Sequence, residues 1–195
     1  PFHPALPLRT ERLLLRRTDP AADWPFIHEL YSDEDVQRWL YSGIETPEQS
    51  RARAEKRATE VVLAASGDAI GLMAARAEDG ALVGQCMLTL RSAEHLEGEI
   101  GYIVHPREQG RGYAPEMARE LLRLAFGDVG LHRVIGRLEP RNEASARVLE
   151  RVGMRHEATL HENEWVKGEW QSEGVYALLD REWRAARGAA EPPAR

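Results

Sequence analysis

The sequence predicts a mixed α/β fold in one domain. Segments with apolar residues at helical spacing alternate along the chain with short apolar runs bounded by turn residues. The resulting order is a strand, helices, three strands, a helix, a strand, a helix and a terminal hairpin, which is typical of this class. The chain shows no internal repeat and no linker, and its 195 residues are enough to enclose one hydrophobic core.

Composition and charge exclude several classes of protein. Lys and Arg number 26 against 32 Asp and Glu, a net charge of −6 that disfavours direct binding to nucleic-acid phosphates. No apolar run approaches the roughly 18 residues of a membrane-spanning helix, and the first residues lack a signal-peptide pattern. The single cysteine, Cys86, cannot form an internal disulfide, and its apolar neighbours indicate a buried structural thiol. We therefore expect a cytoplasmic protein without membrane contact.

The first forty residues predict one strand and two short helices. Residues 10–17 are short and apolar in the middle, as expected of a strand. Residues 22–40 carry aromatic and apolar side chains at near-helical spacing. Because Ser32 and Asp33 interrupt that pattern, we expect two short helices rather than one.

A clearer helix start follows at Thr46. Thr46 is a favourable N-cap, Pro47 suits the first helical position, and Gln49 stands where a capping box requires it. We expect this helix to run to about Ala65, with much of its Arg-, Glu- and Ala-rich surface facing water.

The middle of the chain predicts three strands and a helix. Residues 70–77 and 82–90 are apolar runs separated by turn residues 78–80, which indicates a hairpin. Residues 99–104 form a further strand. Residues 114–126 form a helix with one apolar face.

The last third of the chain predicts a strand, a helix and a hairpin. Residues 132–138 are typical of a strand, and Asn142 caps a helix that Gly153 ends. Residues 162–166 and 169–171 flank Lys167-Gly168, which is expected to form a two-residue turn. A last strand is expected at 173–179, and a flexible tail at 184–195.

The loop between residues 104 and 116 is the most informative segment. A strand ends there, glycines follow, and a helix opens with Pro115 in its first turn. Small residues at 110, 112 and 114 let the backbone approach a ligand, and the helix start offers free N–H groups and a positive dipole end. The loop therefore predicts a phosphate cradle. A nucleotide P-loop would need Gly-Lys-Ser/Thr, and a dinucleotide fingerprint would need glycine at 115, so both are excluded.

This loop resembles the pyrophosphate loop of the GNAT superfamily of N-acetyltransferases, Gln/Arg-x-x-Gly-x-Gly/Ala. The matching run is Gln109-Gly110-Arg111-Gly112-Tyr113-Ala114. The similarity continues in L-R-T-E-R-L-L-L-R-R upstream, in residues 130–134, and in the Asn142-x-x-Ser145 helix that ends in Gly153-Met154, where the family has Gly-Phe. It covers residues 8–183 and is most like the branch that acetylates the N-termini of ribosomal proteins.

The resemblance implies a fold and a reaction. The fold would be the GNAT-type acyl-CoA N-acyltransferase fold, a central mixed, mostly antiparallel sheet flanked by helices, in a single domain over residues 8–183. Acetyl-CoA would donate an acetyl group to a primary amine, on a protein N-terminus or a small molecule, by direct attack in a ternary complex and without a metal. Homodimers are common among such proteins, and the sequence does not fix the oligomeric state.

The resemblance also implies which residues hold the donor. The pyrophosphate would lie on the N–H groups of residues 110–114, and the pantetheine arm would pair with the strand backbone at residues 102–104. The implied cofactor-binding residues are Tyr102, Ile103, Val104, Gln109, Gly110, Arg111, Gly112, Tyr113, Ala114, Asn142 and Ser145.

Amine acetylation needs a base for the amine and an acid for the departing thiolate. By resemblance, Glu164 matches the base of the ribosomal-protein branch, and Glu99 lies on the strand where other members place a base. Either could act through a water. Ser145 matches the acid. Solvated carboxylates are the structural alternative for the glutamates, and bonding to the helix backbone is the alternative for Ser145.

Aromatic residues divide between packing and the acceptor pocket. Trp165 and Trp170 are expected to face each other across the terminal hairpin. A second group is Trp24, Phe26, Trp39 and Tyr41. We expect at least half of these four residues to pack in the core and the others to line the acceptor pocket.

Two other functions stay open at this point. The enzyme could transfer a different acyl chain. Alternatively, the protein could be a catalytically silent module that binds acetyl-CoA and regulates a partner, a possibility that turnover on any amine would reject.

Overall fold

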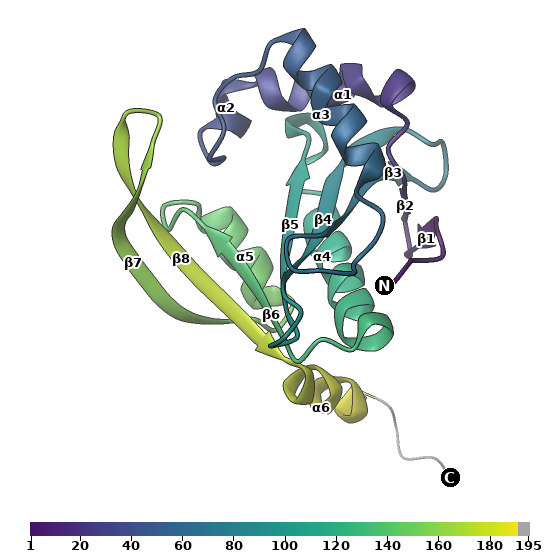
Figure 1. The fold of residues 1–195 in the computed structure, drawn as a ribbon, viewed down its shortest axis with the longest axis vertical. Helices are drawn as coiled ribbons and strands as arrows, with labels where there is room; N and C mark the ends of the chain where they lie inside the picture. Colours follow the sequence, from purple (N-terminus) through teal and green to yellow (C-terminus); the bar gives the residue numbers. More distant parts are fainter. Residues whose placement is uncertain (191–195) are drawn as a thin grey trace.

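One eight-stranded sheet runs through residues 1–190, the part of the chain that the structure describes (Figure 1). In this computed structural model the strand order is β1-β2-β3-β4-β5-β6-β8-β7, and neighbouring strands are antiparallel except for the parallel pair β5 and β6. The strands are β1 Leu8–Arg9, β2 Leu13–Arg16, β3 Ala69–Arg76, β4 Leu82–Ser92, β5 Glu97–Val104, β6 Arg133–Leu138, β7 Arg155–Val166 and β8 Glu169–Leu179. The predicted fold class, a mixed and mostly antiparallel sheet flanked by helices, is confirmed.

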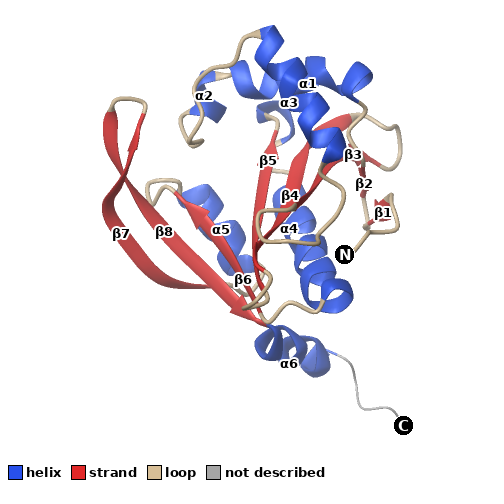
Figure 2. Cartoon of the chain, viewed as in Figure 1, coloured by secondary structure: helices blue, strands red, loops and turns tan. Residues whose placement is uncertain are grey.

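Helices cover both faces of the sheet (Figure 2). They are α1 Pro20–Ser32, α2 Glu34–Gln37, α3 Pro47–Thr59, α4 Tyr113–Arg123, α5 Glu143–Arg151 and α6 Asp180–Ala190. Successive side chains of β3 show the division, because they point to opposite faces. Leu72 and Ala74 belong to the large core cluster with α4, whereas Met73 packs with α1 and α3.

The helix N-caps and the hairpin turn that the sequence predicts are confirmed. Thr46 Oγ1 accepts from the Gln49 N–H, and Gln49 Oε1 accepts from the Thr46 N–H at 2.8 Å, which completes the capping box of α3. Asp33 separates α1 from α2 and caps α2. The predicted hairpin turn has positive φ at Lys167 and Gly168, 52° and 83°, as a two-residue turn between antiparallel strands requires.

The predicted extent of α3 is wrong. The helix ends at Thr59, not near Ala65. The apolar residues after Thr59 are extended instead of helical, because they pair with other extended segments. A helical pattern in the sequence does not reveal such pairing. These bridges are Val61 with Ile70 and Leu63 with Phe2.

Part of the segment predicted as a flexible tail is helical, and its flexibility stays a prediction. Residues 184–190 belong to α6, and residues 191–195 lie outside the described residues. Glu182 in the first turn of α6 accepts a hydrogen bond from the Leu179 N–H at 2.9 Å, and the Trp183 ring packs on Phe126 at 5.6 Å. Like every helix within residues 1–190, α6 is not both long and apolar enough to cross a membrane.

The strands β5 and β6 pair only where they begin. Residues 97–99 of β5 pair with residues 133–135 of β6. Beyond that point β5 continues along β4 to Val104, while β6 continues along β8 to Leu138. The two strands therefore separate, and the sheet opens into a wedge between them (Figure 2).

Gly84 sets the position of β5 at the wide end of this wedge. A Cβ on Gly84 would lie 2.1 Å from the carbonyl oxygen of Ile103, which forces the strands apart. We expect Gly84→Ala to lower the free energy of unfolding by about 1–3 kcal/mol. Gly101→Ala is the control, because a Cβ there meets nothing within 4 Å. Denaturant unfolding compares the two variants, and equal effects would contradict the close packing at Gly84.

Candidate functional site

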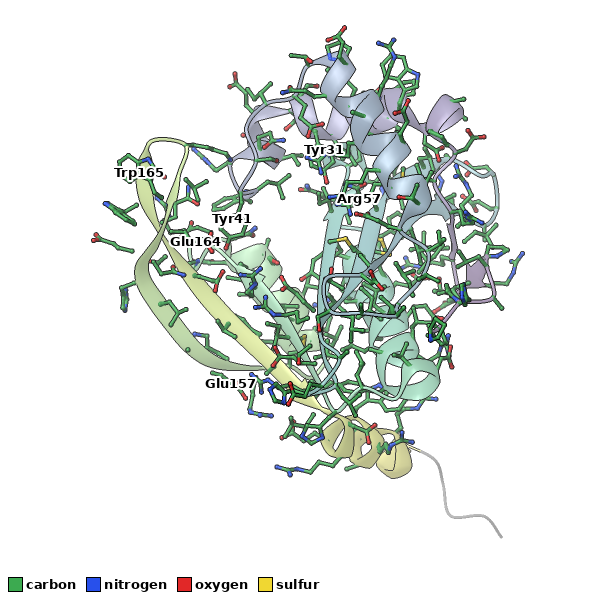
Figure 3. The ribbon with its side chains drawn as sticks, in the orientation of Figure 1. Tyr31, Tyr41, Arg57, Glu157, Glu164 and Trp165 are labelled. Atoms are coloured by element: carbon green, nitrogen blue, oxygen red, sulfur yellow. The ribbon has the colours of Figure 1, made fainter. Side chains whose placement is uncertain are left out.

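A cleft of about 890 Å³ opens where β5 and β6 separate. Its walls come from β5 and the loop to α4, from β6 and the first turn of α5, and from α3 with residues after α2. Figure 3 shows Tyr31, Arg57 and Tyr41 around the space between the β7–β8 hairpin and α1 and α3. The predicted binding residues that line the cleft are Tyr102, Ile103, Val104, Gln109, Gly110, Gly112, Tyr113, Ala114, Asn142 and Ser145.

One edge of β5 is free for a ligand. The His105 N–H donates to the Val83 carbonyl at 2.9 Å, and antiparallel pairing alternates, so odd-numbered residues of β5 bond to β4. The even-numbered residues therefore face β6. The N–H of Ile100 completes the last pairing, with Ile135, and beyond it the carbonyl of Ile100 and both main-chain groups of Tyr102 face the wedge. The Val104 carbonyl faces it too but accepts from Gln109 Nε2 at 3.1 Å. Ile103, predicted to pair with the ligand, contributes its side chain to the cleft while its main chain bonds to β4.

The loop after β5 has the geometry of an anion cradle. Gly110 and Gly112 have positive φ, 76° and 82°, and Gly112 is the N-cap of α4 without a side chain to cap it. The first N–H groups of α4 thus stay available next to the cleft. Arg12 anchors the loop by donating to the Arg111 carbonyl at 2.8 Å.

Arg111 itself points elsewhere. Its guanidinium pairs with Glu108 at 3.2 Å and is not part of the cleft wall. Only the main chain of Arg111 belongs to the cradle, whereas its five predicted neighbours from Gln109 to Ala114 all line the cleft.

Two hydroxyl groups meet across the wedge. The Tyr102 hydroxyl lies 3.2 Å from Ser145 Oγ and donates to the Ser145 carbonyl at 3.3 Å. Asn142 Oδ1 accepts from the Ser145 N–H at 3.1 Å, so the predicted N-cap fixes the start of α5. Burial raises the pKa of Tyr102 to about 12, although the Ser145 bond works in the other direction. Tyr102 therefore stays protonated near neutral pH.

Glu99 is held by arginines instead of facing a ligand. Arg91 donates to one of its carboxylate oxygens at 2.7 Å and Arg137 to the other at 3.0 Å. Glu99 is not part of the cleft wall. With both oxygens engaged, the structural alternative fits Glu99 better than the role of a base.

A second acidic group lies on the β7–β8 side. Arg137 also donates to Glu173, a buried carboxylate with 4% exposure, at 3.0 Å, and the Tyr41 hydroxyl donates to the same carboxylate at 3.4 Å. Burial, Glu173 and Glu164 together raise the pKa of Tyr41. Figure 3 places Glu164 beside Tyr41, on the hairpin and just outside the cleft wall.

The hairpin is fastened to the opposite side of the cleft. Lys167 Nζ donates to the carbonyl oxygens of Gln37 and Leu40, the latter at 2.5 Å. Burial lowers the pKa of Lys167. Through these bonds the hairpin that carries Glu164 reaches the segment that carries Tyr41.

The other sequence predictions divide as follows. Trp39 and Tyr41 line the cleft, whereas Trp24 and Phe26 pack against the core cluster of α1 and α3. The rings of Trp165 and Trp170 meet at 5.3 Å across the hairpin, as predicted. Cys86 is buried, and burial raises its pKa to about 12, which confirms a structural thiol.

Sequence reasoning missed several polar residues of the cleft region. Tyr102 was expected to contribute its main chain alone, and Arg57, Arg137 and Glu173 were not singled out. Glu173 carries a weak signal, because it is a charged residue in a strand whose alternate positions are apolar. Arg137 carries no local signal, since its partners Glu99 and Glu173 are distant in sequence. Arg57 has a local partner in Glu60, but its contact with Met87 is distant in sequence.

Comparisons with known proteins identify the family. Residues 12–155 match the family described as acetyltransferase (GNAT) domain. The uncharacterized N-acetyltransferase YnaD of Bacillus subtilis is 32% identical over 177 residues, which cover 90% of this chain and 98% of that protein. The crystal structure of a GNAT-family acetyltransferase from Bacillus anthracis has a TM-score of 0.79 at 31% identity, with 89% of this chain and 98% of that chain covered.

A more distant structure shares the fold alone. The spermidine N-acetyltransferase of Vibrio cholerae, solved with CoA and spermine, has a TM-score of 0.76 at 20% identity. The match covers 90% of this chain and 99% of that chain.

Proposed function

The chain belongs to the GNAT acetyltransferase family, and on that premise we propose that it moves an acetyl group from acetyl-CoA to a primary amine. The transfer is direct attack in a ternary complex, with residues 8–183 as the catalytic domain. The observation that carries the proposal is the free edge of β5 beside the glycine cradle at the start of α4.

These two features fit the two parts of the donor. The N–H groups from Gly110 to Ala114 bind the pyrophosphate, because uncapped helix N-termini and positive-φ glycines attract and admit phosphate. The carbonyl of Ile100 and the main-chain groups of Tyr102 pair with the amide-bearing pantetheine arm as with an added strand. This pairing leaves the thioester inside the wedge, near Tyr102 and Ser145.

The reaction requires two proton movements. The amine nitrogen attacks the thioester carbonyl carbon, a C–N bond forms and the C–S bond breaks. A base takes one proton from the nitrogen, and an acid returns one proton to sulfur, so CoA leaves as a thiol. Glu164 acts as the base directly or through a water, and its position near Tyr41 at the cleft supports this role. Ser145, bonded to Tyr102, acts as the acid.

Two acceptor classes follow from this assignment. The Asn142-x-x-Ser145 helix and Glu164 support a place in the ribosomal-protein branch, whose acceptors are protein N-termini. The Vibrio cholerae enzyme with the same fold is a spermidine acetyltransferase, which supports a small amine instead.

The first prediction concerns the cradle. Gly112→Glu should weaken CoA binding at least about tenfold, because it places bulk and negative charge against the pyrophosphate and strains a residue with φ of 82°. Gly130→Glu is the control, since Gly130 has a similar φ of 78° at the other end of the helical segment. Calorimetric titration with CoA measures both. If Gly112→Glu bound CoA with unchanged affinity, the glycine cradle would not be part of the donor site.

The second prediction concerns the base. Glu164→Gln should lower kcat by about 10²- to 10⁴-fold with little change in CoA affinity, because the variant can no longer take the amine proton. Glu162→Gln, an exposed neighbour on β7, should keep full activity. Thiol release across a panel of amines and peptides is the assay, and turnover on any of them rejects a catalytically silent module. If Glu164→Gln kept full activity at every pH, the base would be Glu99 or a water.

The third prediction concerns the acid. Ser145→Ala and Tyr102→Phe should each lower kcat about tenfold or more, and the double variant should be no worse than the slower single variant, because the two hydroxyls act as one unit. The measurement is kcat for all three variants together with their melting temperatures. If the variants had lower melting temperatures but an unchanged kcat, the role of Ser145 would be purely structural.

A further inference from the structure

A row of sheet residues with a single side chain lies next to the free edge of β5. The strand register aligns Gly71 of β3, Met87 of β4 and Gly101 of β5 in one row. Two of these three residues lack a Cβ, and a Cβ on Gly101 would meet nothing within 4 Å. The row is therefore a shallow hollow in the sheet, on the face that α3 covers.

Arg57 from α3 fills part of this hollow. Its Nη1 lies 2.8 Å from Met87 Sδ, and its side chain crosses Gly71, where a Cβ would come within 3.2 Å of Arg57 Cδ. Met87 and Gly101 are neighbours across one strand spacing, about 4.8 Å. The guanidinium thus stands roughly one strand away from the edge where the thioester is proposed to lie.

Part of this guanidinium is unused. Glu60 accepts from Nη1 and fixes the group, but Nε and Nη2 have no hydrogen-bond partner within residues 1–190. These two nitrogens form the side of the guanidinium that binds a carboxylate in a bidentate manner. The Arg57 side chain is only 17% exposed and lines the cleft. Arg53, one turn earlier on α3, also lines the cleft and is fixed by Glu45.

The opposite side of the cleft carries carboxylates around one arginine. Arg137 lines the wall there and pairs with Glu99 and Glu173. Glu173 and Glu164 lie there with Tyr41, on the hairpin side of the wedge. A ligand between the two sides would present a cation to the hairpin and an anion to α3. A simple polyamine has no acceptor for the N–H groups of Arg57. The N-terminus of a protein offers only a neutral peptide carbonyl, which lacks the charge and the second oxygen of a carboxylate.

We propose that the acceptor is a small aminocarboxylate, such as an α-amino acid, whose carboxylate binds to Nε and Nη2 of Arg57. The proposal rests on the acetyl transfer proposed above and narrows its acceptor. The short distance from Arg57 to the edge of β5 requires the carboxylate to lie near the amine that is acetylated, which an α-amino acid satisfies.

The test compares each common L-amino acid with its carboxamide, which keeps the amine and side chain but removes the negative charge. At least one amino acid should be acetylated with a kcat/KM about 10- to 100-fold above that of its amide, the range expected for hydrogen bonds to a charged group. Arg57→Gln should abolish this preference by lowering the rate with the amino acid far more than the rate with the amide. A melting temperature and a CoA affinity like those of the wild type show that the variant is folded.

Lys56→Gln is the matched control. Lys56 is the adjacent residue on α3 and pairs with the same Glu60 at 3.8 Å, but its side chain is 78% exposed and lies outside the cleft wall. This variant removes the same charge and should keep the preference for the carboxylate.

The outcomes separate this inference from the proposed function. If amines are acetylated but amides react as fast as amino acids, or if the preference survives Arg57→Gln, the carboxylate site is overturned and the acetyl transfer stands. If no amine is acetylated, the proposed function fails. Calorimetric titration with amino acids and their amides, in the presence of CoA, then tests the carboxylate site at Arg57. Amino-acid binding that exceeds amide binding and depends on Arg57 supports the site, and its absence overturns it.

Discussion

The structure depends on a single discontinuity in hydrogen bonding, the point after Glu99 where β5 and β6 stop pairing. Each strand keeps its other neighbour: β5 stays on β4 to Val104, and β6 stays on β8 to Leu138. Each also keeps its own helix. α4 packs against β4 and β5, and α5 packs against β6 so closely that a Cβ on Gly136 would lie 2.9 Å from Leu149. The sheet is thus two halves joined at one end, and buried main-chain groups at the other end require a partner.

The surroundings of the wedge differ on its two faces. On the α4 and α5 face lie the glycine cradle, the paired hydroxyls of Tyr102 and Ser145, and two arginines of α5, Arg147 and Arg151. On the α1 and α3 face the groups are charged, and nearly every charge already has a partner in the protein. Such pairing offsets the cost of burying charge and holds each group in one position. The faces therefore suit different ligands, a neutral thioester arm on one and a charged acceptor on the other.

Much of this could be predicted from sequence where the signal is local. The capping box of α3, the N-cap at Asn142, the turn at Lys167 and the glycine cradle all depend on residues a few positions apart. Pairing between distant segments could not be predicted in the same way. α3 ends early because Val61 finds Ile70, and β7 begins at Arg155, seven residues before the predicted strand, because a long β8 lies beside it. The Tyr102–Ser145 contact and the place of Arg57 over Met87 likewise follow from sheet register and helix docking.

The central claim is that the free main-chain groups of β5 bind the donor, and amide hydrogen exchange resolved by residue tests it most directly. Addition of CoA should slow exchange at the amide of Tyr102, which faces the wedge. It should change the amides of Ile100 and Ile103 little, because Ile100 is already bonded to β6 and Ile103 to β4. If CoA binds while exchange at the Tyr102 amide stays as fast as before, the edge of β5 is not the donor site and the account is wrong.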